Sequence, residues 1–221
     1  MEPIVLNREF NTRPQRDPRV LEVAESFGLG LSDKKFTVYR DLSIPLEEGD
    51  VVYITGQSGS GKSLALRDMA SELARRGLRV GNIDAVALDP ETALVSQIGS
   101  TTQEALSLMN QAGLNDAYLW VRAPGELSDG QKYRFKLAKL IESGAQVWVA
   151  DEFGAVLDRE TAKIVAFNIS KAARKAGAIL IVATTHGDLV EYLAPTLTIE
   201  KLFGERVEVT RAKWQLVEEE A

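Results

Sequence analysis

The sequence predicts an α/β fold built around a mainly parallel β-sheet. Strand-like and helix-like segments alternate over most of the 221 residues. A glycine-rich loop also joins a β-branched strand, 51–55, to an amphipathic helix, 62–76. Chains that alternate in this way form parallel sheets, because each helix carries the chain back to the edge of the sheet where the next strand starts.

Each element is indicated by its hydrophobic period or by the turn residues around it. After a short first strand, a turn-rich loop is expected at 11–18. Further strands are predicted at 19–24, 36–40, 51–55, 79–83, 93–97, 146–150 and 178–184. Helices are predicted at 62–76, at 100–120 with a break near Gly113, at 129–143 and at 159–176. The tail, 196–210, alternates like a hairpin that turns at Phe203 and Gly204.

Composition limits the class of protein. Apolar residues make up 45% and charged residues 26%, and the net charge of −6 offers no broad basic field to nucleic acid. The absence of cysteine excludes disulfides and thiolate metal sites. The longest apolar run, 176–183, is too short to cross a bilayer, and the first residues lack a signal-peptide pattern. We therefore expect a cytoplasmic protein with no direct membrane insertion, which would act at a membrane only through a partner.

The glycine-rich loop, GQSGSGKS, matches the phosphate-binding P-loop pattern G-x-x-x-x-G-K-[ST] without a mismatch. Glycines let the backbone turn its N–H groups onto phosphate oxygens, and the following helix presents its positive end to the same anion. Lys62 is expected to contact the terminal phosphates, and Ser63 to bind Mg²⁺. The sequence therefore predicts a P-loop NTPase. Its expected ATP contacts are Gly56, Gln57, Ser58, Gly59, Ser60, Gly61, Lys62 and Ser63.

Two acidic residues end the apolar strand at 146–150, in the sequence VWVADE. An aspartate at the end of a buried strand beside a P-loop is placed to coordinate Mg²⁺, and this is the role expected for Asp151. Glu152 is placed to polarise the attacking water as a general base. Alone, such a strand end is most often merely solvated, so the prediction depends on its pairing with the P-loop.

The five residues LSDGQ begin at Leu127 and precede Asp151. In their residues and in their position, between the P-loop and this aspartate, they resemble the LSGGQ signature of the ABC-type ATPases. Arg134 also stands where that family usually has an arginine. The resemblance covers 27–186 and implies a single domain, 1–221, with an antiparallel β-subdomain and a short helical subdomain at 98–126. It also implies that two copies, or this chain and a homologous domain, sandwich two ATP molecules head to tail.

In such a pair, the signature would bind the ATP held by the partner subunit, through Ser128, Gly130 and Gln131. From the residues alone, Ser128 and Gln131 also form a capping box at a helix start, and the two roles are compatible. Asp129 replaces a glycine of the family pattern, and we expect its carboxylate to point away from phosphate.

The resemblance assigns further roles along the chain. Gln97 would sense Mg²⁺ and the attacking water, with Gln103 as the alternative glutamine. Asp158 would contact the partner subunit, although Phe153, Gly154 and Ala155 before it replace the proline and serine usual in the family.

Two further side chains complete the set implied by the resemblance. His186, the only histidine, would reach the γ-phosphate. Phe27 would stack on adenine, although a core phenylalanine fits the sequence almost as well.

The stretch 98–126 bears on the kind of ABC-type ATPase. Transporter subunits usually have a longer helical subdomain there, which docks onto the membrane partner. Chromosome-maintenance and DNA-break-repair members insert a long coiled coil. The short stretch therefore favours ATP hydrolysis that drives a soluble process. The alternatives are the ATP-binding subunit of a transporter, and a low-turnover scaffold or nucleic-acid-associated ATPase.

Two surfaces are candidates for a protein partner or nucleic acid. Tyr118 and Trp120 form either a docking surface or part of the core. Basic side chains gather on two predicted helices, either as solvated faces or as a contact for nucleic acid or an acidic partner. They are Lys132, Arg134, Lys136 and Lys139 on one helix, and Lys171, Arg174 and Lys175 on the other.

Overall fold

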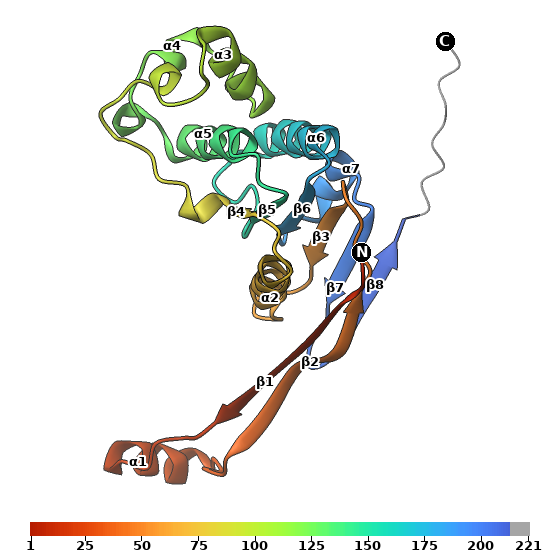
Figure 1. Ribbon diagram of the computed structural model, residues 1–221. Coiled ribbons are helices and arrows are strands. Elements are labelled where there is room, and N and C mark those ends of the chain that lie inside the picture. Colours follow the sequence, from red (N-terminus) through yellow and green to blue (C-terminus); the bar gives the residue numbers. More distant parts are fainter. Residues whose placement is uncertain (213–221) are drawn as a thin grey trace.

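The computed structural model, which describes residues 1–212, is an α/β structure with two sheets (Figure 1). The central sheet has six strands in the order β4-β5-β6-β3-β7-β8, and β1 and β2 form a separate pair. The strands are β1 (Ile4–Thr12), β2 (Lys34–Ile44), β3 (Val51–Thr55), β4 (Val80–Asn82), β5 (Val147–Ala150), β6 (Ile179–Ala183), β7 (Leu197–Lys201) and β8 (Val207–Arg211). The helices are α1 (Pro18–Phe27), α2 (Lys62–Arg75), α3 (Thr102–Gln111), α4 (Ala117–Trp120), α5 (Asp129–Glu142), α6 (Arg159–Ala176) and α7 (Val190–Leu193).

The central sheet is parallel from β4 to β7, and only β8 runs antiparallel to its neighbour. β1 and β2 pair antiparallel. The predicted fold class is thus confirmed: a mainly parallel central sheet accompanied by an antiparallel β-subdomain. The boundaries predicted for a helical subdomain, 98–126, stay a prediction; α3 and α4 lie within them.

Strand alternation divides the core into two layers. On β3, Val51 and Tyr53 belong to the layer that α3, α5 and α6 cover, whereas Val52 and Ile54 belong to the opposite layer. The opposite layer is closed by α2 and by the β1–β2 pair (Figure 1). β3, β5 and β6 are buried on both faces, as their continuous apolar runs predict. Among the described helices, none is both long and apolar enough to span a bilayer.

Most predicted elements are present close to their expected bounds. The helices predicted at 62–76, 129–143 and 159–176 correspond to α2, α5 and α6, and the terminal hairpin is formed by β7 and β8. The helical stretch at 100–120 is divided into α3 and α4, with Gly113 at a positive φ of 81° between them. Glycine adopts that backbone conformation at little cost, so the predicted break has a local cause.

The strand predicted at 19–24 is wrong, because this segment lies in α1. The Asp17 side chain accepts hydrogen bonds from the Arg19 and Val20 amides, and Pro18 occupies the first turn. Gly28 ends the helix at a φ of 64°. These capping residues at both ends outweigh the strand propensity of the two valines in between.

The strand predicted at 93–97 is also wrong. This segment forms a 3₁₀ turn at Leu94–Ser96, followed by Gln97 as the cap. The Leu94 amide donates to the Arg122 carbonyl at 2.9 Å rather than to a neighbouring strand. In the described part of the chain no sheet edge pairs with this segment, so its apolar residues pack into the core as a turn.

The β1–β2 pair is a long arm that carries α1 at its far end, away from the central sheet (Figure 1). At its base, the arm is attached to α2 by Asp68. Arg8 and Tyr39 both donate hydrogen bonds to this carboxylate, and Arg8 Nε lies 2.9 Å from Asp68 Oδ2. The arm is therefore anchored beside the helix that follows the P-loop.

A buried acid lies directly before the start of β3, at the end of the strand opposite the P-loop. Asp50 is 4% exposed and accepts hydrogen bonds from Thr196 Oγ1 at 2.6 Å and Arg211 NH2 at 2.8 Å. Burial raises the pKa of Asp50, but the hydrogen bonds from Arg211 and Thr196 outweigh it and leave the pKa below its usual range. The pair joins β8, the last described strand, to the start of β3.

We expect Arg211→Met to lower the free energy of unfolding by about 3 kcal/mol, because it leaves the Asp50 carboxylate buried without its cation. Urea unfolding monitored by circular dichroism measures the change. Arg206→Met is the matched control: Arg206 pairs with exposed Glu208 at 3.9 Å, a contact worth at most about 1 kcal/mol. Equal losses in the two variants would contradict the assigned role of the Asp50–Arg211 pair.

Candidate functional site

A cavity of about 630 Å³ lies where three parallel strands end. The P-loop (56–63) follows β3, Asp151 follows β5, and the segment 184–186 follows β6. Because β5, β6 and β3 are neighbours in the sheet, their carboxyl ends bring these three segments together. The lining residues are Ser58, Gly59, Gly61, Lys62, Ser63, Leu64, Arg67, Asp151, Glu152, Ala155, Ala183, Thr184, Thr185 and His186.

The P-loop is wrapped around the lysine that the motif predicts. Lys62 Nζ donates to the carbonyls of Gly56 at 2.9 Å and Gln57 at 2.8 Å. Burial lowers the pKa of Lys62, and the nearby Asp151 and Glu152 carboxylates act in the opposite direction. Ser60 Oγ is buried without a hydrogen-bond partner among the described residues. A partly desolvated ammonium is a group that a bound polyphosphate would satisfy, whereas Ser60 is not among the residues that line the cavity.

Two glycines of the loop leave no room for a side chain. Gly56 has a φ of 135°, and a Cβ there would lie 2.1 Å from the carbonyl oxygen of Lys201. Gly61 has a φ of 106°, and a Cβ there would lie 2.9 Å from a methyl carbon of Val38 on β2. The glycines thus allow both the backbone conformation and the contacts with β7 and β2.

Ser63 and Asp151 meet across the sheet edge: Ser63 Oγ donates to Asp151 Oδ1 at 2.9 Å. Arg67 NH2 lies 3.6 Å from the other carboxylate oxygen. A hydroxyl and a carboxylate are oxygen ligands of the kind that Mg²⁺ prefers. Residues 1–212 contain no cluster of three or more His, Asp or Glu side chains placed to hold a metal by themselves. An ion bound here would therefore take further ligands from phosphate and water.

Glu152 lines the same cavity and is exposed. Its φ is 46°, a left-handed conformation that is uncommon for a residue with a side chain. The Glu152 amide donates to Asp151 Oδ1 at 3.0 Å. Such conformations persist where the surrounding structure enforces them, and they occur preferentially at functional sites.

His186 also lines the cavity, and three contacts orient it. Its amide donates to Thr184 Oγ1 at 3.1 Å, and its carbonyl accepts from the Tyr53 hydroxyl at 3.0 Å. Arg159 NH1 lies 3.0 Å from His186 Nδ1. Arginine can only donate, so Nδ1 must accept, and the neutral ring then carries its proton on Nε2. Arg159 also pairs with Asp188 at 2.5 Å.

The predicted signature lies at the start of α5 and forms the predicted capping box. Ser128 Oγ accepts from the Gln131 amide at 3.3 Å, and Gln131 Oε1 accepts from the Ser128 amide at 2.9 Å. The Asp129 side chain is 87% exposed and lies 3.8 Å from Lys132. A Cβ on Gly130 would lie 3.2 Å from the Val156 carbonyl, so the signature packs against the loop before Asp158.

Asp158 is the N-cap of α6 and accepts from the Thr161 amide at 3.0 Å. Hydrogen bonds from Thr161 lower the pKa of this exposed carboxylate. Before it, Phe153 is fully buried and packs edge-on against Tyr133 at 6.2 Å. Phe153, which departs from the family pattern, therefore contributes to the core.

Neither Gln97 nor Phe27 lines the cavity. The Gln97 side chain forms hydrogen bonds with the backbone of Asp89 instead: Nε2 donates to the Asp89 carbonyl at 2.9 Å, and Oε1 accepts from the Asp89 amide at 3.0 Å. The alternative, Gln103, lies on α3 and lines a different cavity. Phe27 is 75% exposed at the end of α1, on the far end of the arm (Figure 1). In this arrangement the P-loop and Phe27 do not meet.

The arm carries another exposed aromatic pair, one that sequence reasoning missed. Phe10 and Phe36 are partners in the β1–β2 register, and each is 46% exposed. On β2, Phe36 lies two residues before Val38, which is next to Gly61 of the P-loop. Only the pairing of β1 with β2 brings these two residues together, so the signal was not local. Arg159 and Lys201 were missed for the same reason.

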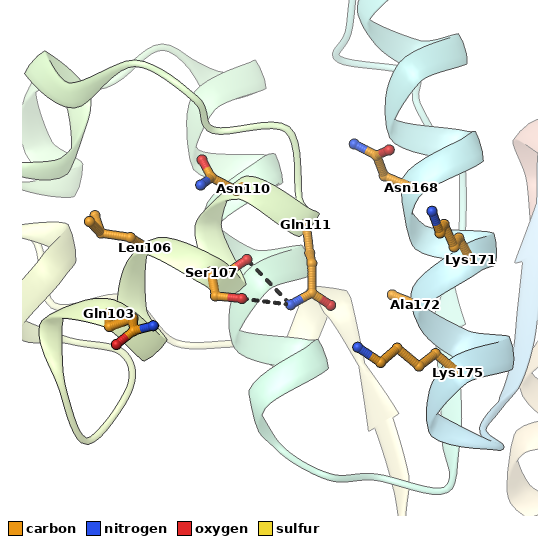
Figure 2. A pocket seen from close by; sticks show the side chains of 9 residues that line it. All are labelled: Gln103, Leu106, Ser107, Asn110, Gln111, Asn168, Lys171, Ala172 and Lys175. Atoms are coloured by element: carbon orange, nitrogen blue, oxygen red, sulfur yellow. Dashed lines mark hydrogen bonds between the residues drawn. The ribbon is translucent and has the colours of Figure 1, made fainter.

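A second cavity, of about 650 Å³, lies between α3 and α6 (Figure 2). Lys171 and Lys175 line it from α6, and Gln103, Ser107 and Gln111 from α3 (Figure 2). Two of the four predicted basic residues on α5 are engaged within the protein instead. Lys139 Nζ donates to the Gln97 carbonyl, and Arg134 NH1 donates to the Gly113 carbonyl at 2.8 Å. That helix therefore offers less free positive charge than its sequence suggests.

A family model described as ABC transporter matches residues 39–155, more than half of the chain. The chain belongs to the ABC transporter family. The cytochrome c biogenesis ATP-binding export protein CcmA of Sphingopyxis alaskensis is 33% identical over 163 residues, which cover 65% of this chain and 80% of that protein. The methionine import ATP-binding protein MetN of Myxococcus xanthus is 25% identical, over 75% of this chain and 60% of that protein.

Solved structures agree on the fold. A dimeric ATP-binding cassette in a post-hydrolysis state with ADP and Pi has a TM-score of 0.62 and 20% identity. The similarity covers 83% of this chain and 95% of that one. The protein is thus an ABC-type ATPase cassette of the P-loop NTPase fold, and the predictions of ATP binding and of ATPase activity are confirmed.

Proposed function

We propose that this cassette hydrolyses ATP in a head-to-tail pair, with a second copy or a homologous cassette, and that closure of the pair does mechanical work on a bound partner. The observation that supports the proposal is that the predicted site residues of one chain lie in two separate places. Ser128 and Asp158 are exposed at the N-terminal ends of α5 and α6, outside the cavity of their own chain. Helix N-termini favour anions, so Ser128 is suited to the phosphates of a facing subunit.

Within one subunit, the P-loop and Lys62 would hold the phosphates. Ser63 and Asp151 would hold Mg²⁺, which neutralises phosphate charge, and Gln97 would join them after its segment moves. Glu152 would accept a proton from the attacking water, while His186 would donate its Nε2–H to the γ-phosphate. The Arg159–His186 contact supports this last role, because it fixes the tautomer that can donate.

For the base of ATP, we propose Phe10 and Phe36 in place of Phe27. Val38 of β2 touches Gly61 of the P-loop, and Phe36 lies two residues before it on the same strand. Half-exposed aromatic rings at that position offer a stacking surface to a purine. Phe27, at the far end of the arm, has no such neighbour in the P-loop (Figure 1).

The partner that receives the work has two candidates. The relatives CcmA and MetN are named for export and import, which supports a membrane transporter as partner. Tyr118 is 78% and Val121 70% exposed, and Val121 shares a surface hollow with Ala93. Trp120 is not part of this surface, because its Nε1 donates to the Leu114 carbonyl at 2.8 Å inside the fold. The short stretch 98–126 supports the second candidate, a soluble process in the cytoplasm.

We expect Glu152→Gln to abolish hydrolysis, keep ATP binding, and trap an ATP-dependent dimer, because only the proton acceptor is lost. Light scattering with and without ATP measures the mass, and phosphate release measures turnover. Ser128→Arg in the same background is the control and should restore the monomer by crowding the helix end. A Glu152→Gln protein that stays monomeric with unchanged turnover would refute the proposal.

We expect Phe36→Ala to weaken ATP and ADP binding equally, by about tenfold, because the two nucleotides share the base. Calorimetric titration gives both affinities. Tripolyphosphate, which lacks a base, should bind Phe36→Ala as it binds the unchanged protein. Phe27→Ala is the matched control and should keep its ATP affinity. If Phe27→Ala weakened ATP binding and Phe36→Ala did not, Phe27 would be the stacking residue.

We expect the full chain to co-purify with a membrane protein from detergent extracts of its own cells, and the Tyr118→Ser, Val121→Ser double variant to lose that partner. Phe203→Ser, at an 83% exposed residue on the β7–β8 turn, is the control and should keep it. A chain that stays wholly in the soluble fraction, with or without ATP, would favour the soluble candidate.

A further inference from the structure

The β7–β8 turn places a buried lysine against the P-loop. Lys201 is fully buried at the end of β7, directly after Glu200, which pairs with Thr55 in the sheet. Its carbonyl oxygen would lie 2.1 Å from a Cβ on Gly56, and its Cε 3.7 Å from a Cβ on Gly61. Lys201 is not among the residues that line the phosphate cavity. It therefore contacts both ends of the P-loop from behind.

The ammonium of Lys201 is stabilised by carbonyl groups alone. Nζ donates to the Leu202 carbonyl at 2.7 Å and the Gly204 carbonyl at 2.6 Å. Among residues 1–212, no carboxylate forms an ion pair with it, whereas buried Asp50 has its counter-ion in Arg211. Burial accordingly lowers the pKa of Lys201. A buried cation without a counter-ion is costly, so such a residue needs an explanation.

We propose that Lys201 is a positioning residue for the nucleotide, whose buried charge attracts ATP phosphates through the backbone of the P-loop. Charges in a protein interior are screened far less than charges in water, so the attraction extends across the loop. Lys62 would contact the phosphates directly, and Lys201 would add a second positive charge behind Gly61. Bound polyphosphate would supply the counter-charge that Lys201 lacks. The proposal rests on the P-loop as the ATP site.

A purely structural role predicts different behaviour. If Lys201 only closes the β7–β8 turn through its two hydrogen bonds, removing them destabilises the free protein. If its charge matters, a neutral side chain of similar shape leaves the free protein equally stable or more stable, since an unpaired buried charge is removed. The loss then appears only when phosphates bind, and it grows with the number of phosphate charges.

The experiment compares Lys201→Met, Lys201→Gln and Lys201→Arg by calorimetric titration and thermal unfolding. Lys201→Met should bind ATP about tenfold more weakly, ADP less affected and adenosine unchanged, with no loss of melting temperature in the free protein. Lys201→Gln, which keeps hydrogen-bond donors but no charge, should behave like the Met variant, and Lys201→Arg should retain most of the affinity. Lys171→Met, an exposed lysine on α6, controls for net charge.

A pH profile keeps the test decisive if the neutral variants fold poorly. Arginine stays charged at any accessible pH, so ATP affinity should fall more steeply at alkaline pH in the unchanged protein than in Lys201→Arg. Equal ATP affinity in Lys201→Met and the unchanged protein, restoration by glutamine, or identical pH profiles would each overturn the proposal. An unchanged protein that fails to bind ATP would instead refute the ATP site itself.

Discussion

The hydrogen bond between Ser63 and Asp151 is the contact on which the site depends. It joins the helix after β3 to the end of β5, although β6 lies between these strands in the sheet. The bond can form only because the three strands run parallel and end at one edge. The same edge brings Glu152 and His186 to the cavity. A single topological constraint thus gathers a nucleotide-binding loop, two acids and a histidine from distant parts of the sequence.

The P-loop itself is held by neighbours on several sides. On the cavity side, Lys62 Nζ donates a hydrogen bond to a carbonyl group of the loop. Val38 of the arm contacts Gly61, and Lys201 of β7 contacts Gly56. A loop with five exposed or half-buried polar residues would otherwise be free to move. Because these contacts fix the backbone before nucleotide binds, less ordering remains to oppose binding. The arm and the terminal hairpin therefore belong to the site, although neither carries the motif.

The sequence predicts those parts of the protein whose physics is local. The P-loop, the acids after β5 and the capping box of α5 depend on neighbouring residues, and the structure has them at the expected positions. The valines of segment 19–24 favour a strand, whereas Asp17, Pro18 and Gly28 specify a helix. Lys201, Arg159 and the Phe10–Phe36 pair depend on contacts across long sequence separations, which no periodicity reveals. The roles of Ser128 and Asp158 toward a partner subunit, and of Gln97 toward Mg²⁺ and the attacking water, stay predictions.

The contacts around Gly130 bear on communication between two sites. Gly130 packs against Val156, and Asp158, two residues later, caps the helix that begins with Arg159. Arg159 in turn contacts His186 Nδ1 in the cavity of the same chain. In the proposed pair, phosphate bound at Ser128 would belong to the facing subunit, so it would lie at one end of a continuous series of contacts that ends at His186. Each subunit would then position its own histidine according to the nucleotide bound to its partner. This series of contacts would decide whether the two subunits hydrolyse ATP alternately or simultaneously.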